Sequence, residues 1–216
     1  MQALPYKKFL YSSWKYSFSS QRYFGPLIAL DFIIFHWNNE TLNVWSHLGG
    51  FLILTYLQYW TLFEALPSVQ APLIDYLVMT MSIICCQICM LLSSAYHIFG
   101  CHSPTRRKQW LKADLFGVSA ALVGLYMSGL YTSFYNFPLH GGLYNAHVQR
   151  WLPNLCVLFI LLGGAFIFYT TLLPERKFDL IGCSHQWWHL LVLIAMAFWH
   201  WSGIQLLSHY HSIKQI

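Results

Sequence analysis

Two histidines lie one helical turn apart at the start of a long apolar segment. The stretch Cys183–Gly203, CSHQWWHLLVLIAMAFWHWSG, carries them as His185 and His189. Residues four apart share one face of a helix, and a histidine pair at this spacing commonly binds a transition metal. Histidines in membrane helices also bond backbone carbonyls or lie among lipid headgroups, so the pair alone leaves these alternatives open.

Three further residues are expected at the same membrane depth and on the same side. His97 ends one apolar segment, Ser93 precedes it by one turn, and Asp114 opens the next segment. Ionisable groups within a membrane are functional candidates because they are costly to bury unpaired. We therefore predict one zinc site with His97, His185 and His189 as ligands and with Ser93 and Asp114 beside a bound water.

The predicted site has two interpretations. Three imidazoles and one open position are typical of catalytic zinc, which lowers the pKa of its bound water toward 7. Asp114 would then act as general base in the hydrolysis of an amide or ester presented from the bilayer, with Ser93 as its neighbour. Alternatively the zinc is structural and ties distant helices together in a receptor or scaffold.

The segments that must position these residues are long and uncharged. The 216-residue chain is 57% hydrophobic and 9% charged, whereas soluble domains are about 25% charged. A membrane-spanning helix needs about 20 apolar residues, so we predict an all-α, polytopic transmembrane bundle with five spans. The five predicted spans are Val44–Phe63, Leu77–Phe99, Leu115–Tyr135, Leu155–Leu173 and Trp187–Leu207.

Short connections punctuated by proline or glycine are expected between these spans. We predict two regions, a cytosolic and interfacial segment at 1–38 and the transmembrane bundle at 39–212. The N-terminal segment lacks the pattern of a signal peptide. The four predicted connections are Glu64–Pro72, Gly100–Lys112, Asn136–Pro153 and Pro174–Ser184.

Basic residues predict the orientation of the chain, because lysine and arginine are retained on the cytosolic side of membranes. With the N-terminus in the cytosol, ten of the twelve basic residues fall on the cytosolic side, including Arg106, Arg107 and Lys108. Only Arg150 and Lys214 fall on the other side. The net charge of +5 therefore reflects topology and contact with anionic membrane lipids, and no nucleic-acid partner is expected.

Other polar residues have structural interpretations. Glu40, Asn43 and His47 share one helical face at the cytosolic start of the first predicted span. We expect them to cap that helix and to form hydrogen bonds with neighbouring helices. The alternative is that they contact a partner protein or the metal. His102 is expected to be a loop histidine. Cys85, Cys86 and Cys89 are expected to be small buried side chains. Six histidines are expected to be interfacial or solvent-facing: His36, His140, His147, His200, His209 and His211.

Three sequence blocks resemble a known family, the progestin and adipoQ receptors, which are adiponectin receptor-like and related to haemolysin III. The first block, Glu40–His47, matches the family pattern E-x-x-N-x-x-x-H. The second is Ser93–His97, followed by Cys101–Ser103 and Asp114. The third is Pro174–Arg176 followed by His185–His189. The order and number of these blocks make the resemblance specific.

The resemblance implies zinc bound by His97, His185 and His189, with Ser93 and Asp114 beside the bound water. It also implies a receptor role in signalling and a cytosolic N-terminus. Some relatives have ceramidase-like activity, so a ceramide-like substrate is the enzymatic alternative. The blocks most resemble those of a Golgi-resident member that tethers Raf kinase and restrains MAP kinase signalling. Golgi membrane is therefore the expected location, with the plasma membrane as the alternative.

The chain departs from the family in its number of spans. The family has seven core spans and this sequence predicts five, with the fourth and most of the fifth missing between the third predicted span and Asn136–Trp151. Removing two spans keeps the sidedness of everything that follows, so the zinc ligands are still expected to meet. A shortened, inactive form is a further alternative.

Overall fold

The computed structural model describes residues 40–100, 104–134, 141–171 and 183–214, and for 104, 141–148 and 213–214 its backbone only. The predicted segment 1–38 and three histidines (His36, His102 and His140) lie outside the described residues. Within the described residues the elements are all helices. They are α3 (Thr41–Trp60), the π-helical turn η1 (Thr61–Ala65), α4 (Leu66–Ser68), α5 (Leu73–Phe99), α6 (Pro104–Phe134), α7 (Gly141–Thr171) and α8 (Ser184–Lys214).

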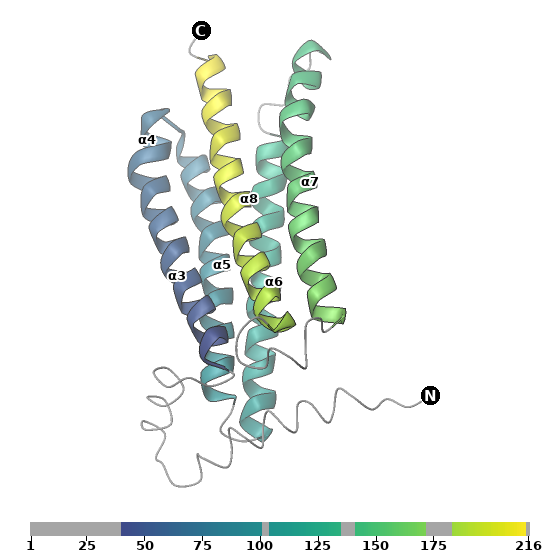
Figure 1. Ribbon diagram of the computed structural model, residues 1–216. Helices are drawn as coiled ribbons and strands as arrows, with labels where there is room; N and C mark the ends of the chain where they lie inside the picture. Colours follow the sequence, from purple (N-terminus) through teal and green to yellow (C-terminus); the bar gives the residue numbers. More distant parts are fainter. Residues whose placement is uncertain (1–39, 101–103, 135–140, 172–182, 215–216) are drawn as a thin grey trace.

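The five long helices form one antiparallel bundle (Figure 1). Helices α3, α6 and α8 begin at one end of the bundle, and α5 and α7 begin at the other end. Helix α5 packs against α3 and α6, while α7 contacts the rest chiefly through α8. The predicted all-α, polytopic bundle is therefore confirmed. This arrangement places the end of α5 and the starts of α3, α6 and α8 at one end of the molecule.

Four helices of the described chain are long and apolar enough to cross a membrane, namely α5, α6, α7 and α8. Lipid exposure is clearest on α7, where Ile160 is 72% exposed and Phe159 65% exposed, since a water-facing helix would not present such side chains. Helix α3 forms where the first span is predicted, but it is not among these four. Its Thr55 and Gln58 side chains accept hydrogen bonds from Gln87 of α5, and its role as a span stays a prediction.

Two of the predicted connections are shorter than expected. The structure begins α6 at Pro104 and α7 at Gly141, so most of Gly100–Lys112 and Asn136–Pro153 is helical. Proline suits the first position of a helix because its missing N–H has no partner there. Proline is also tolerated inside transmembrane helices, as Pro153 is in α7. The predicted connections therefore extend too far into the helices, and the expected link between proline and helix ends holds at Pro104 but fails at Pro153.

The core at the middle of the bundle depends on close approach between helices. A Cβ added to Gly124 of α6 would lie 2.7 Å from Cβ of Cys85 and 2.9 Å from the carbonyl oxygen of Ser82 on α5. The indole Nε1 of Trp199 on α8 donates a hydrogen bond to the carbonyl oxygen of Leu125 on α6 at 3.0 Å. Both contacts fix the spacing of α5, α6 and α8, which carry most of the predicted site residues.

Replacing Gly124 by alanine is expected to lower the thermal unfolding temperature of the detergent-solubilised protein. The added methyl group would clash with backbone atoms, which cannot move away as a flexible side chain can. Overpacking of this kind lowers the free energy of unfolding by about 1–3 kcal/mol. Gly163→Ala is the matched control, because nothing lies within 4 Å of a Cβ at that position. There the change should be neutral or slightly stabilising. Equal effects of the two substitutions would contradict this account of α5–α6 packing.

Candidate metal centre

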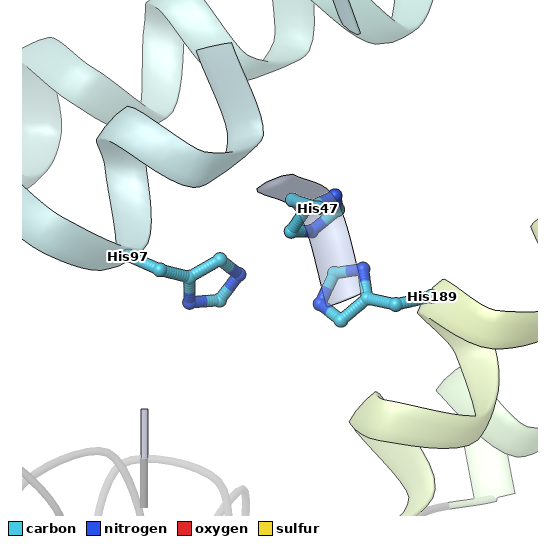
Figure 2. Close-up of side chains that lie close together, drawn as sticks. All are labelled: His47, His97 and His189. Atoms are coloured by element: carbon cyan, nitrogen blue, oxygen red, sulfur yellow. The ribbon is translucent and has the colours of Figure 1, made fainter. Parts of the chain in front are cut away.

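Three helices bring four histidines together at one end of the bundle. His47 lies in the second turn of α3, His97 in the last turn of α5, and His185 and His189 in the first two turns of α8. Figure 2 shows the side chains of His47, His97 and His189 pointing toward one another. Their ring centroids lie 5.5 Å apart for His47 and His97, 4.1 Å for His47 and His189, and 5.2 Å for His97 and His189.

Three of these histidines could hold a metal ion. His47, His97 and His189 are at most 7% exposed, and each offers one nitrogen within 4.8 Å of those of the other two. Zinc–nitrogen bonds are about 2.0–2.1 Å long, so ligand nitrogens in a tetrahedral site lie about 3.3 Å apart. The three nitrogens are therefore within a small side-chain adjustment of that geometry.

Unpartnered buried atoms support the same interpretation. The Nε2 atoms of His47 and His189 are buried and have no hydrogen-bond partner. Burying a polar atom without a partner costs about 1–3 kcal/mol, and a metal ion held by the group would remove that cost. The residues present therefore fit a metal ion held by imidazole nitrogen.

Glu40 fixes the orientation of His97. The Nδ1 atom of His97 donates a hydrogen bond to Oε2 of Glu40 at 2.8 Å, which makes Nε2 the lone-pair nitrogen of that ring. Asn43 donates a second hydrogen bond to the same oxygen at 2.9 Å. Carboxylates that hold the second nitrogen of a ligating histidine are a common feature of metal sites.

The electrostatics of Glu40 follow from these contacts. Burial alone would raise the pKa of its carboxyl group, but the hydrogen bond from His97 and the electrostatic attraction of that N–H group outweigh burial, with smaller help from Asn43 and Arg107. Together they lower the pKa of Glu40 to about 2. Glu40 is therefore a carboxylate at neutral pH and can accept both hydrogen bonds.

The other predicted site residues lie close by. The predicted ligand His185 is not a member of the group that could hold a metal, although its ring centroid lies 5.5 Å from that of His97 and 4.3 Å from that of His189. Ser93 is one turn before His97 on α5, and its hydroxyl donates a hydrogen bond to the Asp114 carboxylate of α6. These five predicted residues are thus gathered at one end of the bundle, although Ser93 and Asp114 are engaged with each other.

Sequence reasoning gave His47 a structural role, but the structure places it in the metal-capable group. The signal was present in the E-x-x-N-x-x-x-H spacing. Glu40 and His47 are seven residues apart, which is about two turns, so both project from one face of the entry to α3. That entry lies at the same end as His97.

A second buried polar cluster lies at the opposite end of the bundle. The carboxylate of Asp75, which is 0% exposed, accepts hydrogen bonds from the Tyr131 hydroxyl and, at 2.6 Å, from Nε2 of His211. His200 is also buried, and its Nε2 is hydrogen-bonded to Oγ1 of Thr61 at 2.8 Å. The expectation that His200 and His211 face lipid headgroups or solvent was wrong, because partners on other helices bury them.

Comparison with known proteins identifies the family to which this chain is similar. The model of the family described as Haemolysin-III related matches residues 35–152 and 137–200. Progestin and adipoQ receptor family member 3 from mouse is 28% identical over 239 residues, covering 83% of this chain and 77% of the relative. The human protein gives the same values. The adiponectin receptor protein of Drosophila melanogaster is 26% identical over 238 residues, covering 82% of this chain and 52% of the relative.

Glu40→Gln is expected to weaken metal binding about 10–100-fold, the usual cost of losing a carboxylate behind a ligating histidine. The amide is a weaker acceptor and leaves His97 less firmly oriented. Zinc affinity of the purified chain, measured by competition with a chelator, tests this expectation. Glu64→Gln changes an exposed glutamate and is the control. Unchanged affinity in Glu40→Gln would show that Glu40 does not position His97.

Proposed function

Because the chain belongs to the Haemolysin-III related family, with progestin and adipoQ receptors among its relatives, we propose that it is a zinc-binding membrane receptor that modulates signalling. The observation that carries the proposal is the group formed by His47, His97 and His189, whose nitrogens lie within 4.8 Å of one another. Three helices that are far apart in the sequence supply these nitrogens.

The donor set favours zinc over other common ions. Magnesium and calcium prefer oxygen ligands, whereas imidazole nitrogen suits zinc, copper, nickel and iron. The group contains no cysteine thiolate, which is a ligand that Cu(I) favours. When bound, zinc would supply a fixed positive charge that satisfies the buried imidazole nitrogens. The histidines would thereby hold the ends of α3, α5 and α8 together.

The orientation in the membrane is part of the proposal. Arg106, Arg107 and Lys108 lie in the first turns of α6, at the same end as the histidine cluster. Basic residues favour the cytosolic side, so the metal centre would face the cytosol. Placement in the Golgi membrane and restraint of Raf kinase rest on the resemblance of the sequence blocks and are proposed on that basis. Membrane lipids surround the exposed faces of α6 and α7.

We also propose that the helical bundle of this chain has fewer spans than the bundles of its relatives. The alignment with the mouse relative spans 239 positions but covers 83% of 216 residues, which leaves about 60 positions without a residue here, enough for two spans of about 20 residues each. The two matched segments of the family model overlap at residues 137–152, which supports a gap between α6 and α7. Each span crosses the membrane once, so the loss of an even number of spans leaves the later helices on their original side. This agrees with the structure, in which α8 begins at the end of the bundle where α5 finishes.

Zinc content of the purified full chain tests the receptor proposal. The wild type is expected to retain about one zinc per chain, and a double variant His97→Gln, His189→Gln is expected to retain none. His209→Gln is the matched control, since His209 is about 30 Å from His189 along α8. A zinc-free wild type purified from zinc-supplied cells, or a double variant that keeps its zinc, would contradict the proposal.

Ceramide hydrolysis separates the receptor from the amidase alternative. The Ser93–Asp114 pair beside His97 is the observation that favours an amidase, because a carboxylate near bound water can act as general base. We expect zinc-loaded wild type and Asp114→Asn to release no fatty acid from ceramide in detergent micelles. Release that depends on zinc and falls at least 100-fold in Asp114→Asn would instead establish the enzyme.

A further inference from the structure

The first turns of α6 carry a basic patch that takes no part in the histidine group. Figure 1 shows α6 beginning beyond the starts of α3 and α8, at the end of the bundle where the histidines lie. Clusters of four or more basic residues directly beside a transmembrane segment are typical of sites for anionic lipid headgroups. The four basic residues here are Arg106, Arg107, Lys108 and Lys112.

The structure divides these side chains between different faces of α6. Cζ of Arg107 lies 5.5 Å from the centroid of the Tyr96 ring on α5, so this side chain packs against the bundle. Lys108 and Lys112 are exposed and lie one helical turn apart on another face of α6. Within the part of the chain that the structure describes, neither lysine forms an ion pair. Their ammonium groups are therefore available to an anion from outside the bundle.

The exposed face of α6 changes from charged to apolar directly after these lysines. Four exposed residues follow the i, i+4, i+7, i+8 spacing of one helical face, namely Lys108, Lys112, Leu115 and Phe116. Leu115 is 56% exposed and Phe116 is 66% exposed. Side chains of this kind face lipid acyl chains in a membrane helix, so the lysines lie at the edge of the hydrocarbon layer.

The rise of the helix gives the depth of each lysine. At 1.5 Å per residue, Lys112 lies about 4.5 Å and Lys108 about 10 Å beyond Leu115 along the helix axis. The headgroup layer on each side of a bilayer is about 5–8 Å thick. Lys112 is therefore at the depth of the lipid phosphodiester, and Lys108 is at the outer edge of the headgroups.

An aromatic contact marks the same depth independently. Trp110, which lies between the two lysines in the sequence, stacks on Phe99 at the end of α5, with ring centroids 5.1 Å apart. Tryptophan is enriched where the hydrocarbon layer of a membrane meets water. The contact therefore supports an interfacial position for the first turns of α6.

The charge of this face is not balanced on its own helix. Asp114 is the acidic residue of segment 104–116, and its carboxylate accepts a hydrogen bond from Ser93 of α5. A lipid complements the face better than an acidic peptide does. Its phosphates and acyl chains follow one another in the same order as the lysines and the apolar residues along α6.

We propose that Lys108 and Lys112 form a binding site for a phosphoinositide, an anionic lipid with a phosphorylated inositol headgroup. Lys112 binds the phosphodiester, and Lys108, one turn further from the hydrocarbon layer, binds the phosphate on the inositol ring. The acyl chains lie along Leu115 and Phe116. The cytosolic leaflet follows from the orientation proposed above, but the chemistry of the site does not depend on it.

Native mass spectrometry of the full chain in neutral detergent provides the test, because it counts bound lipid molecules directly. The probe is dioleoyl phosphatidylinositol monophosphate, and dioleoyl phosphatidylcholine is the reference lipid. The wild type is expected to bind one phosphoinositide about 30-fold more tightly than phosphatidylcholine, since each basic residue near an anionic surface contributes about fivefold. Equal affinity for the two lipids would overturn the proposal.

The double variant Lys108→Gln, Lys112→Gln is expected to lose this preference. Both positions are exposed, and glutamine favours helices about as well as lysine does, so the fold should be kept. Arg150→Gln, Lys214→Gln is the matched control, because it removes the same charge at the other end of the chain's helices and should leave the preference intact. A preference that survives in the first variant, or disappears equally in both, would contradict the site.

Two further probes separate a lipid from other anions. Free inositol bisphosphate is expected to bind at least 10-fold more weakly than the lipid, because it lacks the acyl chains that cover Leu115 and Phe116. A hexaglutamate peptide is expected not to displace the lipid. Equal affinity for the free headgroup, or displacement by the peptide, would assign the patch to a soluble phosphate or an acidic protein and would refute the lipid site. These outcomes leave the zinc measurement unaffected, so the two proposals fail separately.

Discussion

Burial of imidazole nitrogens at the edge of the hydrocarbon layer is the constraint on which the rest of the structure depends. His47 and His189 present buried Nε2 atoms that have no hydrogen-bond partner among the described residues. A buried polar atom without a partner is destabilising, and the cost rises in a membrane because no water is available. A cation shared by helices α3, α5 and α8 would remove that cost and would give three distant segments a reason to meet.

The same constraint explains the composition of α3. Its first turns carry Asn43 and His47, and its last turns carry Thr55 and Gln58, and it is not among the four described helices that are long and apolar enough to cross a membrane. Each polar group has a use within the bundle: Asn43 holds Glu40, His47 joins the metal-capable group, and Thr55 and Gln58 accept hydrogen bonds from Gln87. Polarity that argues against a lipid-facing helix is compatible with one that packs its polar face inward.

Helix α8 connects the two polar ends of the molecule. His189, His200 and His211 follow one another at intervals of eleven residues, which is close to three helical turns, so they share one face. All three are buried, at 7%, 3% and 7% exposure. The first belongs to the metal-capable group, the second bonds Thr61, and the third bonds Asp75. A buried carboxylate such as Asp75 is tolerated because its partners are in place, and it ties α5, α6 and α8 at the end away from the metal centre.

The amino-acid sequence was enough to predict the helical bundle and to place His97, His185, His189, Ser93 and Asp114 at one end of it. Those features follow from the length of apolar segments and from helical periodicity, which are local properties. Helix starts at Pro104 and Gly141 were missed because proline and glycine mark ends in soluble helices more strictly than in membrane helices.

Only the tertiary structure decided the partners of each polar group. Whether His47 faces the metal or a neighbouring helix depends on how α3 is rotated against α5 and α8, and no local pattern fixes that rotation. The same holds for Glu40 with His97, for Ser93 with Asp114, and for Asp75 with His211, since each pair joins segments that are 21 to 136 residues apart. Helical periodicity predicts which face of a helix a residue occupies, whereas packing between helices determines which residues that face contacts.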